Sequence, residues 1–279
     1  MTGDSDITEH YQKGILQDRL KAALVDDGVD PMHPSIEALA PFDHFHGRGL
    51  EATKEMADAL EVAPSDHLLD VGSGIGGPAR YLAHRFGCRV TGIDLTSEFC
   101  DVARQLTRML GLEDRVKFEQ GNALSAPFPD GHFHGAYSMN VSMNIADKIR
   151  FYKEIFRMLR PGAWLVLSEL ALGPNGGPDY PTPWALTAQT SFLASPSETL
   201  NGLESTGFTV VKSRDTVKEN LAFNARSREM VDRGEKPPHR AVKLIHGELA
   251  ADAASNTINA IKNARLIPIE VLCRKPNGA

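Results

Sequence analysis

Cysteine is scarce in this chain of 279 residues, and its three thiols are scattered. Cys88, Cys100 and Cys273 form no Cys-x-x-Cys pair, which argues against a disulfide framework or a thiolate zinc site. Cys88 and Cys273 fall in expected strands, so the sequence favours buried, reduced thiols.

Basic runs, long apolar runs and histidine ligand motifs are also absent. The net charge is −6, which argues against a nucleic-acid partner. No apolar stretch approaches the ~20 residues that span a membrane, and the acidic start MTGDSDITEH does not resemble a secretion signal. The ten histidines contain no His-x-x-His-type set of ligands. We therefore expect a cytoplasmic protein with no membrane insertion and no metal site.

What the sequence does contain is a strand–turn–helix signal at residues 68–83, LLDVGSGIGGPARYLA. An apolar run ends in Asp70, a glycine cluster follows, and an amphipathic helix comes next. Glycines permit a sharp turn and let a ligand approach bare backbone. The amides that open the helix face that ligand at the positive end of the helix dipole. The segment therefore predicts a binding site for a nucleotide-like ligand.

Two kinds of ligand fit this turn. Gly72-x-Gly74-x-x-Gly77 matches the dinucleotide pattern, and Asp94 lies 17 residues after Gly77, near the acid expected on a ribose. Asp70, in contrast, would attract the cationic amino group of a methionine moiety, whereas a pyrophosphate needs amide donors at that point. No second mononucleotide-type unit follows residue 170, which disfavours an NAD-linked oxidoreductase.

The elements after the turn resemble, in order and polarity, the core of class I S-adenosylmethionine-dependent methyltransferases over residues 68–170. CRVTGIDL (88–95) places an acid at a strand end, where it can accept both ribose hydroxyls. GNAL (121–124) carries an amide beside the adenine where an acid is usual. The resemblance implies S-adenosylmethionine as cofactor and S-adenosylhomocysteine as product. It implies these cofactor-binding residues: Asp70, Gly72, Ser73, Gly74, Gly76, Gly77, Asp94, Leu95, Asn122, Ala123, Met139 and Asn140.

The sequence predicts an α/β fold with a doubly wound seven-stranded sheet. Strands are expected near 67–72, 88–94, 115–119, 133–138, 162–170, 208–214 and 266–274. The resemblance implies a Rossmann-like methyltransferase sheet, mostly parallel, with the last strand antiparallel between its two predecessors. We expect a helical N-terminal lid over residues 1–62 and a methyltransferase core over 63–279. The core is expected to carry an active-site loop at 171–195 and a helical insertion at 217–264.

Three further segments resemble a small-molecule branch that includes sarcosine and dimethylglycine N-methyltransferases and relatives of quinone C-methyltransferases. They are FDHFHGRGLEAT (42–53), SMNIADK (142–148) and PTPWA (181–185). The resemblance favours an amine nitrogen as methyl acceptor, with an oxygen or carbon acceptor of another small metabolite as the alternative. His46 is the candidate general base, because its segment is expected to cover the cofactor. Aromatic faces could hold a cationic amine, and an arginine could pair with a carboxylate. The candidate pocket residues are Tyr11, Phe45, Arg48, Met143, Asn144, Tyr180 and Trp184.

A second hypothesis is a catalytically silent subunit that binds the cofactor without turnover. Methyl transfer needs no protein nucleophile, because alignment alone can contribute roughly 7–11 kcal/mol. Asn122 and the unusual segment 42–53 leave room for the silent subunit, which product formation on any acceptor would exclude. We expect a small-molecule substrate, and a homodimer is plausible.

Overall fold

The computed structural model describes residues 15–278, and its centre is a seven-stranded sheet with strand order β3-β2-β1-β4-β5-β7-β6. Strands β1 to β5 pair in parallel, whereas β7 is antiparallel to both β5 and β6. The predicted fold class is confirmed, including the antiparallel last strand between its two predecessors. The strands are β1 His67–Val71, β2 Arg89–Asp94, β3 Val116–Gln120, β4 Phe133–Met139, β5 Leu159–Leu172, β6 Thr209–Asp215 and β7 Leu266–Arg274.

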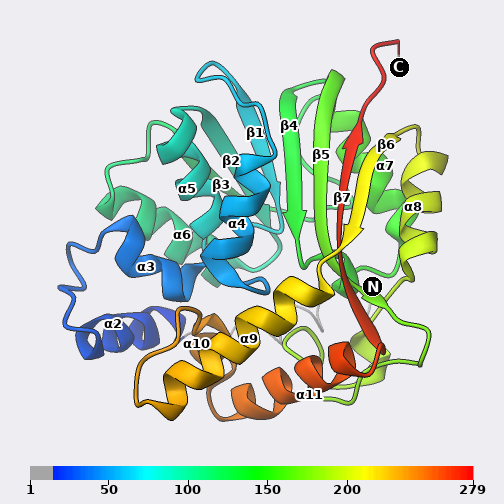
Figure 1. Cartoon of the computed structure of the whole chain (residues 1–279). Coiled ribbons are helices and arrows are strands. Elements are labelled where there is room, and N and C mark those ends of the chain that lie inside the picture. Colours follow the sequence, from blue (N-terminus) through cyan, green and yellow to red (C-terminus); the bar gives the residue numbers. More distant parts are fainter. Residues whose placement is uncertain (1–14, 279) are drawn as a thin grey trace.

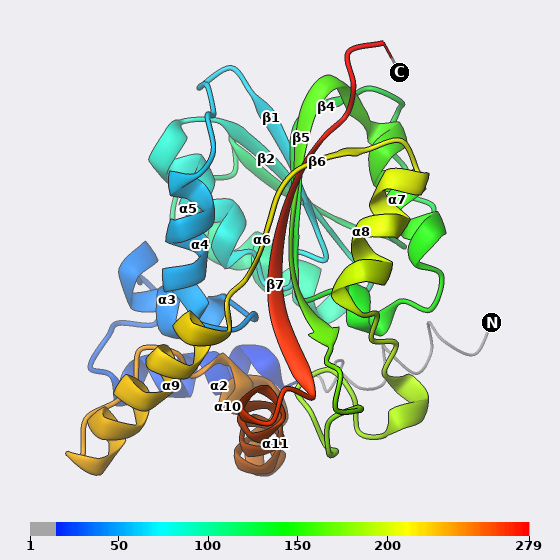
Figure 2. The ribbon, with the colours of Figure 1, turned by 45° about the vertical axis from the view of Figure 1, so that its right-hand side comes forward.

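Helices cover both faces of the sheet, as the buried, apolar central strands require. Helices α4, α5 and α6 lie on one face, and α7 and α8 lie on the other (Figure 2). The helices are α2 Leu16–Asp26, α3 Ile36–Asp43, α4 Gly49–Asp58, α5 Gly77–Phe86, α6 Ser97–Met109, α7 Lys148–Met158, α8 Pro196–Ser205, α9 Val217–Asp232, α10 Ala241–His246 and α11 Ala250–Lys262. Three single turns of 3₁₀-helix are η1 Ser142–Asn144, η2 Ala188–Thr190 and η3 Gly247–Leu249.

The carboxyl ends of the parallel strands form one edge of the sheet, and additional helices lie beyond that edge. Helices α2, α9, α10 and α11 lie below the arrowhead of β4 (Figure 1). The strand order reverses between β1 and β4, which pair with each other at the centre of the sheet. Open α/β sheets bind ligands at such a switch point, outside the carboxyl ends of the strands.

Some elements differ in detail from the sequence expectations. β5 begins at Leu159, three residues early, because Leu159 pairs with Phe133 before a register shift in β4. The N-terminal segment is divided into α2, α3 and α4, and Ser35 caps α3 by accepting a hydrogen bond from the Ala38 amide. The predicted helical region 217–264 contains α9, α10, η3 and α11. The division into lid and core remains a prediction. No helix among residues 15–278 is long and apolar enough to cross a membrane.

Candidate cofactor and acceptor site

The glycine turn lies directly after β1, at the switch point of the sheet. Gly72, Gly74 and Gly76 adopt φ values of 76°, 52° and 82°, a region that favours glycine. A Cβ on Gly72 would lie 2.3 Å from Cγ2 of Val141, so the turn also packs too closely for a side chain. Gly76 is the N-cap of α5, whose first residue is Gly77. The sequence therefore folds here as predicted, into a turn that presents backbone amides.

Asp70 lies next to this turn on β1 and is fully buried. Apart from each other, neither its Oδ2 atom nor the nearby hydroxyl of Tyr137 has a hydrogen-bond partner among the described residues. Burial raises the pKa of Asp70 to about 8, the charge of Asp94 acts in the same direction, and the Tyr137 hydroxyl opposes them. A buried carboxylate without a partner is costly, and a bound ammonium group would remove that cost.

The Asp94 side chain connects the end of β2 to the glycine turn that follows β1. Its Oδ2 accepts a hydrogen bond from the Gly74 amide at 2.8 Å, and its Oδ1 accepts one from the Thr96 amide at 2.9 Å. Burial raises the pKa of this carboxyl, and the two amides oppose that shift. Asn122 lies just beyond β3, where its Oδ1 accepts a hydrogen bond from the Leu124 amide at 2.8 Å. Leu95 follows Asp94, and Ala123 packs against the central core.

Asn140 follows Met139 at the end of β4 and has a positive φ of 56°. Its backbone amide donates to the Ser168 carbonyl at 2.7 Å. With its side-chain amide oriented to satisfy both neighbours, the nitrogen donates to Ser168 O at 3.3 Å. The oxygen accepts from the Gly47 amide at 3.2 Å. Asn140 therefore joins the sheet edge to the N-terminal part of the chain.

Residues 43–48, called the covering segment below, lie against the glycine turn. A Cβ on Gly74 would be only 3.0 Å from the ring of Phe45, which packs edge-to-face on Phe99 at 5.2 Å. Asp43 pairs with the buried Arg80 of α5 at 2.9 Å. The segment that was expected to cover the cofactor therefore contacts both the turn and the helix that follows it.

His46 is buried in the covering segment and belongs to a short hydrogen-bonded chain. Its Nε2 lies 3.1 Å from the Thr53 hydroxyl, and that hydroxyl lies 2.9 Å from Nδ1 of His44. The Nδ1 of His46 lies 3.2 Å from the Gly47 carbonyl. Burial lowers the pKa of His46 well below its ordinary value, and burial lowers that of His44 to about 3. Both rings are therefore neutral, with hydrogen-bond partners inside the protein.

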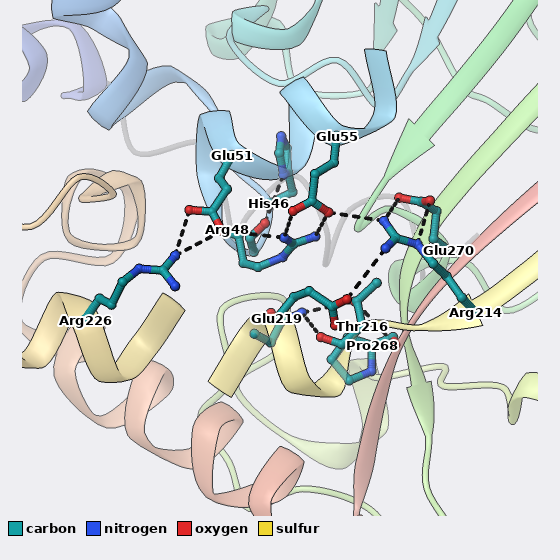
Figure 3. A network of polar contacts seen from close by, with 12 residues as sticks. His46, Arg48, Glu51, Glu55, Arg214, Thr216, Glu219, Arg226, Pro268 and Glu270 are labelled. Carbon is teal, nitrogen blue, oxygen red and sulfur yellow. Dashed lines mark hydrogen bonds and ion pairs between the residues drawn. The ribbon is translucent and has the colours of Figure 1, made fainter. Parts of the chain in front are cut away.

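Arg48, a candidate for substrate binding, is instead paired within the protein. Its guanidinium is buried and donates to both oxygens of Glu55, at 2.7 and 3.0 Å. Glu55 also accepts from Arg214 at 3.1 Å, and Arg214 in turn pairs with Glu270 at 3.1 Å (Figure 3). Arg48 itself has a left-handed φ of 62°, which is strained for a residue other than glycine. The network also includes Glu51, Glu219 and Arg226.

Three predicted acceptor-pocket residues meet beside the carboxyl end of β5. Met143 of η1 and Trp184 share a buried apolar cluster, against which Tyr180 packs. The Trp184 indole donates to the Ser191 hydroxyl at 2.9 Å. Asn144 lies on the same 3₁₀ turn as Met143. Phe45 and Arg48 belong to the covering segment instead, and Tyr11 lies outside the described residues.

Other polar residues at this edge were not identified from the sequence. Glu169 lies on β5 and is 4% exposed, and its signal is an acid inside the otherwise apolar run LVLSELAL. Lys148 opens α7, where a cation opposes the helix dipole. Arg80 and Tyr137 lie within an ordinary helix and strand, so no local signal distinguished them. Over the span 15–278, no group of three or more His, Cys, Asp or Glu side chains could hold a metal ion.

Comparisons with known proteins agree with this geometry. A family model described as a methyltransferase domain matches residues 69–167. The chain is 36% identical to phosphoethanolamine N-methyltransferase 1 of Arabidopsis thaliana over 127 residues, 46% of this chain and 26% of that protein. It is 40% identical to 24-methylenesterol C-methyltransferase 2 of Oryza sativa subsp. japonica over 123 residues, 43% of this chain and 34% of that protein.

A solved methyltransferase structure has the same fold as this chain. A solved structure of geranyl diphosphate methyltransferase with GPP and sinefungin superposes with a TM-score of 0.73 at 20% identity, covering 99% of this chain and 100% of the other. The chain spans only about a quarter to a third of the curated relatives named above. The strand order, the turn after β1 and the matched domain confirm the resemblance found in the sequence. Residues 69–167 are therefore a methyltransferase domain, and the chain is similar to S-adenosylmethionine-dependent methyltransferases in sequence and in fold.

Proposed function

We propose that this chain transfers a methyl group from S-adenosylmethionine to a small molecule. The observation that carries the proposal is Asp70, a buried acid beside the glycine turn whose Oδ2 has no partner in the described chain except the Tyr137 hydroxyl. The α-ammonium group of a methionine moiety fits this acceptor in charge and in hydrogen-bonding capacity. The residues present therefore fit the cofactor.

The other residues of the site have complementary roles in this proposal. The turn at 72–77 leaves the backbone open to the methionine part, and Asp94 would exchange its amide partners for ribose hydroxyls. Asn122 would face the adenine through its side-chain amide. The bound cofactor supplies an electrophilic methyl group on a sulfonium. Phe45 and the rest of the covering segment would exclude water, while Met143 and Trp184 would orient the acceptor.

We infer that the acceptor atom is an amine nitrogen. A neutral amine attacks with its lone pair and can lose its proton to water, so it needs no strong protein base. A carbon or phenolic acceptor would need one, and His46 is a weak candidate because burial keeps its pKa low and both its nitrogens have partners. The relatives named above include an N- and a C-methyltransferase, so carbon is the second candidate atom and oxygen the third.

Calorimetric titration tests cofactor binding. We expect the purified chain to bind S-adenosylmethionine and S-adenosylhomocysteine, and not NAD⁺. Asp70→Asn should weaken binding of both adenosyl ligands, whereas the exposed Asp114→Asn, a matched control, should not. Binding of NAD⁺ alone would overturn the proposal and restore the dinucleotide interpretation of the turn.

Turnover tests the acceptor. The chain would be incubated with S-adenosylmethionine and sarcosine, dimethylglycine or phosphoethanolamine, and with phenolic and isoprenoid compounds. Formation of S-adenosylhomocysteine with an N-methylated product supports the nitrogen proposal. Turnover on carbon or oxygen acceptors alone would contradict it. Cofactor binding without turnover on any of them would favour the silent subunit.

A further inference from the structure

The short turn η1, which carries Met143 and Asn144, is held by the side chains of Glu169 and Lys148. At its start, the Ser142 amide donates to both carboxylate oxygens of Glu169, each at 3.2 Å. The Lys148 ammonium donates at 2.5 Å to the carbonyl of Ser142, within the turn, and at 2.5 Å to the carbonyl of Ile145, directly after it. A helical turn exposes free amides at its start and free carbonyls at its end. A carboxyl group that accepts the first amide and an ammonium group that donates to the Ile145 carbonyl both match this polarity.

Lys148 does not stabilise its own helix by interaction with the helix dipole. It is the first residue of α7, where the helix dipole disfavours a cation. Among the described residues its ammonium group forms no salt bridge, although Glu169 attracts it electrostatically, and its three hydrogen bonds go to backbone carbonyls. An ammonium has three donors, so this set satisfies it completely. The Lys148 side chain therefore stabilises the backbone around η1 through these three carbonyl groups.

The third of these bonds reaches the predicted active-site loop. Lys148 donates to the Phe192 carbonyl at 2.5 Å, and the Phe192 amide donates to the Met143 carbonyl at 2.8 Å. A hollow of about 350 Å³ adjoins this contact and is lined by Lys148, Ile149 and residues 192–194 among others. The two hydrogen bonds at Phe192 tie this part of the loop to η1, while the Leu172 amide, which donates to the Ala194 carbonyl at 2.8 Å, ties it to β5.

Glu169 supports the same turn from inside the sheet. It lies on β5 one residue after Ser168, whose carbonyl accepts the Asn140 amide. A carboxylate can accept about four hydrogen bonds, and a leucine or valine would fit the surrounding apolar strand better. The acid at position 169 is therefore explained by its hydrogen bond from the Ser142 amide and not by apolar packing.

We propose that Lys148 and Glu169 are positioning residues of the acceptor site, which fix η1 and join it to the loop at Phe192. With both side chains in place, Met143, Asn144 and the loop segment around Trp184 keep fixed positions relative to one another and form one wall of the acceptor site. This assignment rests on the proposed function only in treating that wall as the acceptor side. The link itself is a property of the protein alone.

Amide hydrogen exchange on the full chain tests the link without an acceptor. In Lys148→Met we expect exchange at residues 142–145 and at Phe192 to be faster on the order of tenfold, because a charge-assisted anchor is lost. Exchange at residues 72–77 should be unchanged, and S-adenosylmethionine should still bind within about twofold of wild type. Lys153→Met, an exposed lysine of the same helix, is the matched control and should leave exchange at both segments unchanged.

Two further variants separate positioning from general stability. Lys148→Arg keeps the charge and several donors, so it should recover part of the protection at Phe192. Glu169→Gln keeps an acceptor but loses the charge, so exchange at Ser142 should rise while the glycine turn stays protected. Once an acceptor is known, Lys148→Met should raise its KM and leave the Kd of S-adenosylmethionine unchanged.

Two results would overturn the assignment. Exchange in Lys148→Met that matches Lys153→Met would show that the lysine anchors nothing. A uniform rise that includes residues 72–77 would show a general structural role instead. Failure of wild type to bind S-adenosylmethionine would contradict the proposed function but leave the exchange pattern interpretable, so the two failures are distinguishable.

Discussion

The carboxylate of Asp94 accepts a hydrogen bond from the Gly74 amide at 2.8 Å, which joins the end of β2 to the glycine turn after β1. The same carboxylate accepts the Thr96 amide at 2.9 Å. One side chain thus holds together the two strand ends between which the adenosine part of the cofactor is proposed to lie.

Replacing Asp94 should therefore affect cofactor affinity in a graded way. Asp94→Asn keeps one acceptor oxygen and should weaken S-adenosylhomocysteine binding about tenfold, whereas Asp94→Ala should weaken it on the order of a hundredfold. Calorimetric titration measures both values. Equal affinities for wild type and Asp94→Ala would remove this residue from the site.

Cofactor binding should release a proton from Asp70. Burial raises the pKa of the free carboxyl to about 8, so it is mostly protonated at pH 7. A bound ammonium group favours the ionised form, so the affinity for S-adenosylmethionine should increase as the pH rises from 6 towards 8. Titration in buffers of different ionisation enthalpy should show release of about one proton at pH 7. No release, or an affinity that falls over this range, would contradict the role of Asp70.

In the protein without bound cofactor, the Asp70 carboxyl should lower the free energy of unfolding. Its folded-state pKa lies above its ordinary value of 3.8, so the folded state binds the proton more tightly than the unfolded state does. The free energy of unfolding should therefore fall as the pH rises from about 4 to about 8. Asp70→Asn removes this dependence and should raise the free energy of unfolding by about 1–3 kcal/mol at pH 8. Urea denaturation at pH 5 and pH 8 measures the difference, and a destabilised variant at pH 8 would refute it.

The network around Arg48 should stabilise the covering segment. Glu55 is its only bidentate partner in the described part of the chain, so Glu55→Gln leaves a buried guanidinium with a weaker acceptor. Glu55 is 33% exposed, and after allowance for solvent screening we expect a loss of about 1–2 kcal/mol in the free energy of unfolding. The exposed Glu229→Gln serves as the control for removal of one negative charge. Equal urea midpoints for the two variants would show that the network contributes nothing measurable.

The parts of the molecule that were predicted correctly have strong local signals. The run of apolar residues, acid and glycines at 68–77 encodes β1, its turn and the start of α5 within a single segment, so the amino-acid sequence is enough to locate this strand–turn–helix unit. The strand order β5-β7-β6 followed from family resemblance, because nothing in the last strand itself specifies its partners.

The contacts of the Arg48 network and of η1 were not predictable in the same way. Arg48 meets Arg214 through Glu55, and Glu169 meets Ser142, across long separations in the chain. Such contacts depend on the register of neighbouring strands and helices, which no single segment encodes. Arg48 therefore suggested a substrate ligand, whereas in the fold its donors are directed to Glu55.

A crystal structure of the chain with S-adenosylhomocysteine would test the central claim most directly. We predict that the amino nitrogen of the ligand lies about 3 Å from Oδ2 of Asp70, with the ribose hydroxyls at Asp94. A ligand seated elsewhere, with a water molecule or a side chain as the partner of Asp70 Oδ2, would contradict the account.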